Sequence, residues 1–167
     1  KIIPVIEKAS GKKYGKDFGF IFNPEFLREG SAFEDFENSP LTVAGGEFDR
    51  DISIIRKLYE FCINDENQFF AEHLEFAELL KYVNNTFHAL KISFANEIGV
   101  LAKSANVDGQ RLMNAFCADT KLNISSAYLR PGFAFGGSCL PKDTSALINY
   151  SKSKKIDTKL ISSILES

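Results

Sequence analysis

The chain has 167 residues, 44% of them hydrophobic and 16 of them phenylalanine, which suffices for one domain, or one domain and part of another. A formal net charge of −2 gives no general attraction for nucleic acid, so an anionic ligand must be met by a local cluster of cations. No stretch reaches the ~20 apolar residues of a membrane span, and no signal peptide is visible. Three cysteines without a CxxC pair disfavour a disulfide framework or a metal site, and we expect a cytoplasmic protein.

A helical pattern is present at both ends of the chain, from its first residues and up to its last. The first residues read KIIPVIEK, typical of the tail of a helix, and the last read SILES. No GxGxxG follows a predicted strand, so the usual dinucleotide fingerprint is missing. We therefore interpret the chain as the middle portion of a longer enzyme.

The first part of the chain has the pattern strand, helix, strand. Short apolar runs predict buried strands at residues 18–22, 41–44 and 68–71. Between the last two, apolar residues at helical spacing predict a helix over 47–63. This order is typical of a parallel α/β unit, and we interpret residues 1–72 as the last strands and helices of a Rossmann-like domain.

Residues 73–167 are predicted to form a helical domain. A pattern without proline or clustered glycine predicts a helix from about His73 to Ala105, a rod of about 50 Å. Its single apolar stripe favours contact with a second copy of the chain. The stripe consists of Leu79, Val83, Phe87, Leu90, Phe94, Ile98 and Leu101. Shorter helices are expected over 110–117, 122–129, 140–151 and from 158 onward. The predicted fold class is thus mainly α with a small α/β part.

Four polar residues of the long helix point in one direction. At ~100° per residue, Lys81, Asn85, His88 and Asn96 fall within an arc of about 80°. A lysine, two amides and an imidazole would supply donors to a polar, anionic ligand. The alternative is an ordinary solvated face. The low density of charged residues favours an enclosed polar site.

The segment Asn23–Gly30 reads NPEFLREG and places two carboxylates four residues apart, Glu25 and Glu29. Paired carboxylates can divide labour, one activating water while the other holds substrate. The alternative is two unrelated surface glutamates.

A lone cysteine, Cys139, lies within the run RPGFAFGGSCLPKD, after a Gly-Gly pair. Pro141 suits the first turn of a helix, which would place Cys139 at the positive end of that helix beside Lys142. In that position a thiolate is favoured over a thiol. Asp143 would lie on the same helical face, one turn later. The alternative is a small buried apolar residue, as most cysteines without a disulfide are.

These segments together resemble the UDP-glucose/GDP-mannose dehydrogenase family, which oxidises nucleotide sugars at C6. GFAFGGSCLPKD resembles its cysteine signature, NPEFLREG its acidic loop, and residues 77–99 its long central helix. The resemblance implies an NAD-dependent, four-electron oxidation of a sugar alcohol to a uronate, through a thiohemiacetal and a thioester on the cysteine. It also implies that residues 1–72 are the C-terminal remnant of an NAD-binding domain and that residues 73–167 are a central domain for dimerisation and catalysis. It further implies a homodimer formed through the long helix, and a product that feeds extracellular polysaccharide.

The resemblance also implies roles for individual residues. The implied catalytic residues are Cys139, Lys81, Asn85, Glu25 and Asp143. The implied substrate-binding residues are Glu29, Phe26, Leu27, His88, Asn96, Tyr128, Arg130, Phe133 and Gly136. Lys142 is expected to approach the cofactor or a substrate phosphate.

The segment from Lys121 to Cys139 is most similar to the GDP-mannose branch of the family. Arg130-Pro131 and the spacing of Phe133 and Phe135 favour that branch, whereas Ala127-Tyr128 departs from its usual pair of tyrosines. UDP-glucose and a UDP-N-acetylhexosamine remain alternative substrates. A different hypothesis is a dimerisation scaffold without catalysis, which would need no activated cysteine.

Overall fold

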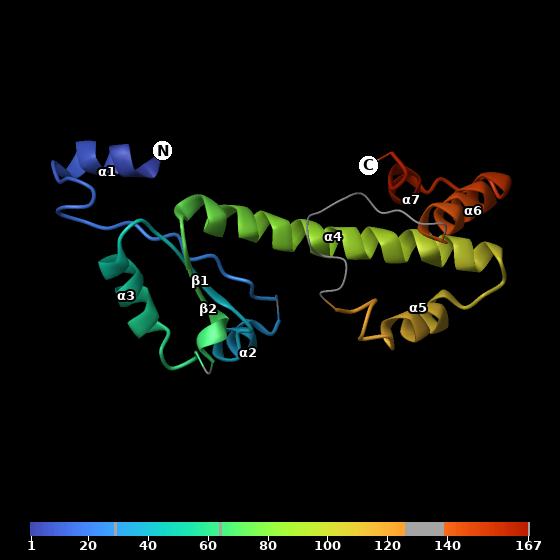
Figure 1. Cartoon of the computed structure of the whole chain (residues 1–167), viewed down its shortest axis with the longest axis horizontal. Coiled ribbons are helices and arrows are strands. Elements are labelled where there is room, and N and C mark those ends of the chain that lie inside the picture. The colour runs from blue at the N-terminus through green and yellow to red at the C-terminus, as the bar shows by residue number, and fades with distance from the viewer. Residues whose placement is uncertain (29, 64, 126–138, 167) are drawn as a thin grey trace. The chain divides into compact units, whose positions relative to one another are not determined.

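The computed structural model describes residues 1–28, 30–63, 65–125 and 139–166 (Figure 1). The chain divides into two compact units, Lys1–Thr86 and Phe87–Ser167. The elements in chain order are α1 (Ile2–Ser10), α2 (Ala32–Glu37), β1 (Thr42–Gly45), α3 (Asp49–Leu58), η1 (Glu66–Gln68), β2 (Phe69–Glu72), α4 (Leu74–Ser104), α5 (Gly109–Cys117), α6 (Cys139–Ser153) and α7 (Lys159–Ser163). The predicted fold class, mainly helical with a small α/β part, is confirmed.

The first unit contains the predicted parallel strand–helix–strand arrangement. β1 and β2 pair in parallel, in a register that runs from Thr42 opposite Phe69 to Gly45 opposite Glu72. α3 connects them and packs against β1. All four residues of β1 are buried, as expected for a strand rich in small and β-branched residues. α3 is shorter than the predicted helix over 47–63, because the chain turns after Leu58.

The strand predicted at residues 18–22 is wrong. Within this run, Phe18 and Phe22 form isolated bridges only, Phe18 with Tyr14 and Phe22 with Gly45. The N–H and C=O of Phe22 each bond to Gly45 at 2.8 Å. An apolar run becomes a strand only where several successive residues pair with a neighbouring strand. In the described part of the chain, this run forms only isolated bridges. The sequence analysis also missed α2, a single short helix.

The start of α4 lies directly against the end of β1. A side-chain carbon at Gly45 would come within 2.6 Å of the Ala77 methyl group, and Ala77 is fully buried. Only a glycine at this position lets the helix approach so closely. The contact fixes the first turns of α4, so Lys81, one turn after Ala77, has a defined position in the unit.

The second unit is built around Leu101, Ile148 and Ile161, which belong to α4, α6 and α7. Five further side chains pack against this cluster: Phe94, Ile98, Leu147, Tyr150 and Ile156. The Glu97 carboxylate accepts hydrogen bonds from the backbone N–H groups of Leu160 and Ile161, at 2.9 and 3.0 Å. This contact satisfies two N–H groups at the start of α7 that have no partner within the helix.

The shorter helices agree with their predictions except one. α5 is capped by Asp108, whose carboxylate accepts from the Arg111 N–H at 3.1 Å. α6 begins at Cys139, close to its predicted start. The helix predicted over 122–129 is not formed in its described part, since residues 122–125 make turns. The remainder of that prediction lies outside the described residues.

The predicted apolar stripe of α4 divides into two kinds of residue. Leu101 is buried, and Phe94 and Ile98 pack against the core, so these three are used within the unit. Leu79, Val83 and Leu90 are exposed. No helix in the described part of the chain is long and apolar enough to cross a membrane.

Candidate active site

The centre of the site in the first unit is an ion pair between Glu25 and Lys81. Lys81 Nζ lies 2.7 Å from Glu25 Oε1 and also donates to the Glu25 carbonyl oxygen. The Leu27 N–H donates to the second carboxylate oxygen, Oε2, at 2.8 Å. Lys81 comes from α4 and Glu25 from the NPEFLREG loop, 56 residues apart in sequence. The structure therefore joins two of the three motifs that the sequence analysis treated separately.

The pair is arranged to keep Glu25 ionised. The hydrogen bond from Lys81 lowers the pKa of the Glu25 carboxyl, and the hydrogen bond from the Leu27 amide adds to the effect. The Glu25 side chain is 60% exposed, while that of Lys81 is 26% exposed and passes over the Phe26 ring at 5.6 Å. The cation is thus partly enclosed, and the carboxylate faces water.

A hollow of about 330 Å³ opens beside the ion pair. Its lining comprises Phe22, Glu78, Lys81, Tyr82 and Asn85. Lys81 and Asn85 are one turn apart on α4 and present an ammonium and an amide to the same space. Small-molecule sites begin at about 300 Å³, so the hollow has room for part of a polar ligand such as a sugar.

The loop beyond Leu27 is closed by a bidentate ion pair. Arg28 Nε and Nη2 donate to the Asp35 carboxylate at 3.0 and 2.6 Å, and the Arg28 N–H donates to it at 2.8 Å. These bonds hold the pKa of Asp35 well below its ordinary value. Arg28 is not among the predicted site residues, and its observed contact is with Asp35 of α2.

Cys139, Lys142 and Asp143 lie together in the first turns of α6, in the second unit. The side chain of Cys139 is exposed, as the hypothesis of a reactive thiol requires and the alternative of a buried apolar residue does not. Lys142 Nζ lies 3.5 Å from Asp143 Oδ1, and both side chains are largely exposed. Pro141 stands in the first turn of the helix, as predicted.

The other predicted site residues fall into two groups. Asn96 and His88 are exposed on the part of α4 that belongs to the second unit. Glu29, Tyr128, Arg130, Phe133 and Gly136 lie outside the described residues. The predicted proximity of Cys139 to Lys81 and Asn85 joins the two units and stays a prediction. In the described part of the chain, no group of three or more His, Cys, Asp or Glu side chains could hold a metal ion.

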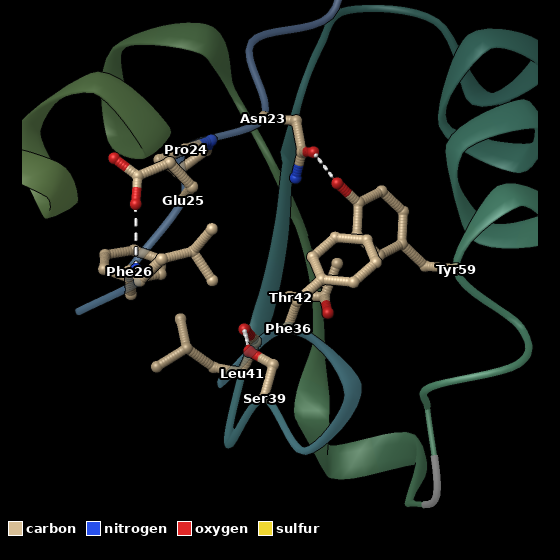
Figure 2. A pocket seen from close by; sticks show the side chains of 10 residues that line it. Asn23, Pro24, Glu25, Phe26, Phe36, Ser39, Leu41, Thr42 and Tyr59 are labelled. Atoms are coloured by element: carbon tan, nitrogen blue, oxygen red, sulfur yellow. Dashed lines mark hydrogen bonds between the residues drawn. The ribbon is translucent and has the colours of Figure 1, made fainter. Parts of the chain in front are cut away.

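Sequence reasoning missed two residues that hold the loop, Asn23 and Tyr59. The Tyr59 hydroxyl lies 2.6 Å from Asn23 Oδ1 (Figure 2). Asn23 Nδ2 also donates to the Val43 carbonyl, at 2.7 Å. Asn23 is the first residue of NPEFLREG, so the motif itself was a signal. Tyr59 follows α3 and had no sequence signal that pointed to the loop.

Comparison with known proteins shows the family of the chain. Residues 75–167 match the central domain of the UDP-glucose/GDP-mannose dehydrogenase family, and residues 1–63 match its NAD binding domain. The chain belongs to this family.

Within the family, the chain is similar to several GDP-mannose 6-dehydrogenases. It is 46% identical over 167 residues to the one from Pseudomonas syringae pv. tomato and 47% identical over 166 residues to the one from Azotobacter vinelandii. Each match covers 99% of the chain and 37% of the relative, so the chain spans little more than a third of their length. The crystal structure of a ternary complex of GDP-mannose dehydrogenase from Pseudomonas aeruginosa superposes with a TM-score of 0.91 at 42% identity, over 99% of this chain and 37% of that one.

Proposed function

We propose that the chain is the middle part of an NAD-dependent GDP-mannose 6-dehydrogenase, which oxidises the C6 alcohol of the sugar to a carboxylate. The observation that carries the proposal is the contact between Glu25 and Lys81, which brings the acidic loop and the long helix into one polar site. The similarity to GDP-mannose 6-dehydrogenases over 99% of the chain supports the substrate. A UDP-glucose 6-dehydrogenase is the alternative, because one from Haloferax volcanii is also similar, at 34% identity.

The residues of the chain fit a role beside NAD. β1, α3 and β2 form a parallel strand–helix–strand unit, the kind from which NAD-binding domains are built. Lys142 is the residue that we propose to approach the cofactor or a substrate phosphate. Bound NAD would accept the two hydrides of the reaction, one per NAD molecule.

In the proposed covalent stage, Cys139 Sγ bonds to C6 of the sugar aldehyde and the carbonyl oxygen takes a proton. The resulting thiohemiacetal loses a hydride and a proton to become a thioester. Water then adds to the thioester carbon, the C–S bond breaks, and the sulfur leaves as a thiolate. The water supplies the oxygen of the uronate and releases its protons.

The other residues would orient and stabilise these steps. Lys81 and Asn85 share one hollow and would hold the oxyanion that forms at the thioester carbon. A carboxylate whose pKa is lowered is a weak base, so Glu25 would orient the attacking water by accepting its hydrogen bond rather than by taking its proton outright. Asp143, one turn after Cys139, would contact the same water.

The experiment is an assay of the chain at the full length of its relatives, with GDP-mannose and NAD. We expect two NADH per sugar, and a loss of at least about 10³-fold in turnover for Cys139→Ser. Cys117→Ser is the matched control, because Cys117 is also exposed but lies on α5. Mass spectrometry of a rapidly quenched reaction should find the sugar bound to Cys139. A Cys139→Ser enzyme that still forms the uronate at the original rate would disprove the covalent mechanism.

Thiol reactivity separates the enzyme from a scaffold without catalysis. A nucleophilic Cys139 should be alkylated faster than Cys117, and Cys62 should react last, because it is buried and burial raises the pKa of its thiol. Alkylation of Cys139 no faster than that of Cys117 at every pH would favour the scaffold. The assay needs no substrate, so it is independent of which sugar is oxidised.

We also propose that the protein forms a homodimer through α4. The support is the exposed apolar group Leu79, Val83 and Leu90 on a helix of 31 residues. Sedimentation should show a dimer that Val83→Glu dissociates. Leu112→Glu, at an exposed position of α5, should leave the dimer intact. A monomer at all concentrations would contradict the proposal.

A further inference from the structure

The loop that carries Glu25 is tied to β1 and to the end of α3 through one side chain, that of Asn23. Its amide bridges the Val43 carbonyl, at 2.7 Å, and the Tyr59 hydroxyl, at 2.6 Å. Figure 2 shows Tyr59 reaching across to Asn23, next to Pro24 and Glu25. Both bonds are partly buried, where an unpaired polar atom is costly.

The direction of each bond follows from the donors and acceptors available. The Val43 carbonyl can only accept, so the Asn23 NH₂ group must face it and Oδ1 must face Tyr59. The Tyr59 hydroxyl must therefore donate to Oδ1. Burial raises the pKa of Tyr59, so the hydroxyl keeps the proton that it donates. The arrangement accommodates a single orientation of the Asn23 amide.

Pro24, between Asn23 and Glu25, couples the position of Glu25 to that of Asn23. It is buried and has no N–H, so the chain at this point is held by the side chain of Asn23 and by the packing of the proline ring. A proline also restricts the residue before it to extended backbone, which limits how Asn23 and Glu25 move relative to each other. A displacement of Asn23 would therefore move Glu25 with respect to Lys81.

The side chain of Tyr59 is itself held in place by packing. Tyr59 follows the last residue of α3, and its ring packs against Phe36 of α2 with centroids 5.6 Å apart. The cavity between Tyr59, Asn23 and the loop measures about 30 Å³, too small for a sugar nucleotide, whose sites need about 300 Å³ or more. This side of the loop is thus a support, and the ligand-sized hollow beside Lys81 is a separate feature.

We propose that Tyr59 and Asn23 are positioning residues that hold the Glu25 carboxylate against Lys81. The inference rests on the proposed function for its catalytic meaning, because Glu25 is there the group that orients the hydrolytic water. Neither side chain need touch the substrate. The charged group that contacts Glu25 is Lys81. Glu78, one turn earlier on α4, lines the hollow beside Lys81, and Arg28 is bound to Asp35.

The test is an NMR titration of the Glu25 side-chain carboxyl in this chain, with Tyr59→Phe. The variant keeps the ring and its packing on Phe36 and removes only the donor. We expect the titration midpoint of Glu25 to move up toward its ordinary value, because the carboxylate loses its fixed contact with Lys81. Asn23→Leu, a neutral side chain of similar size, should do the same, since it removes both the donor to the Val43 carbonyl and the acceptor for Tyr59.

The matched control is Tyr150→Phe, which also removes a tyrosine hydroxyl from a partly buried hydrogen bond, to Ser104 in the second unit. It should leave the Glu25 midpoint unchanged. The proposal is overturned if the midpoint stays in place in both Tyr59→Phe and Asn23→Leu, or if Tyr150→Phe moves it equally.

An activity measurement at the full length of the relatives completes the test. Tyr59→Phe should lower kcat between about 10- and 100-fold, with KM for the nucleotide sugar nearly unchanged, because the misplaced group acts after binding. If the midpoint moves but no sugar nucleotide is oxidised, the proposed function fails and the positioning of Glu25 stands. If oxidation is normal and the midpoint does not move, the positioning fails and the function stands.

Discussion

The loop around Glu25 and the start of α6 at Cys139, which carry the proposed chemistry, are held in place in different ways. Both carboxylate oxygens of Glu25 accept hydrogen bonds from the chain itself, and the loop is tied down on either side of it by Asn23 and Arg28. At the start of α6, Leu140, Lys142 and Asp143 are exposed, and the helix is held through Ile148, more than two turns further on. The loop of the first region is fixed within a few residues of its functional group, whereas the helix that carries Cys139 is anchored in the core further along, at Ile148.

Within the first region, removing the cation should have the largest effect. In a full-length enzyme, Lys81→Met should lower turnover by about 10²–10³-fold, the usual effect of losing one group that stabilises an oxyanion. Steady-state kinetics with GDP-mannose would measure it. Lys91→Met is the control, since Lys91 lies on α4 over the Phe87 ring. Equal losses in the two variants would mean that Lys81 has no special part in the reaction.

The anchor of the second region is tested by Ile161→Ala. Ile161 is 2% exposed, so its truncation should cost about 2–5 kcal/mol of stability in the second unit. Hydrogen exchange of the α6 amides would report the loss, and the Glu25–Lys81 contact in the first unit should remain. Leu165→Ala, at an exposed position, should change little. Loss of the Glu25–Lys81 contact in the Ile161→Ala variant would show that the two regions are not independent.

Much of the fold could be predicted from the sequence because its signals are local. The spacing of apolar residues locates α3, α4, α5 and α6 to within a few residues, and Gly45-Gly46 marks the end of β1. The run 18–22 was misread because a strand depends on its neighbours, which the run itself does not encode. Likewise Asn23 could be noticed as part of a motif, but its partner Tyr59 is 36 residues away and enters only through the fold.

The link between α4 and α7 offers a smaller effect on the second region. Glu97→Gln removes the charge and leaves one oxygen for two backbone N–H groups, those of Leu160 and Ile161. The expected loss is about 1–3 kcal/mol, because hydrogen bonds to a charged group exceed neutral ones. Chemical denaturation would measure it. Glu166→Gln, at an exposed position of the C-terminal segment, should leave stability unchanged; an equal loss there would assign the effect to net charge.

The pH dependence of stability gives the finest comparison, within the first region itself. Glu25 and Asp35 both have lowered pKa values, through Lys81 and Arg28 respectively, and that of Asp35 is lowered further. A carboxyl with a lowered pKa in the folded state adds stability above its unfolded pKa and loses it as the pH falls through the folded value. The stability difference between the chain and Glu25→Gln should therefore vanish on acidification before the difference for Asp35→Asn does. Urea unfolding at a series of pH values below the ordinary 4.5 of a glutamate would show the order. The reverse order would mean that Lys81 holds Glu25 more firmly than Arg28 holds Asp35, and that the ion pair of the active site is the stronger constraint on the loop.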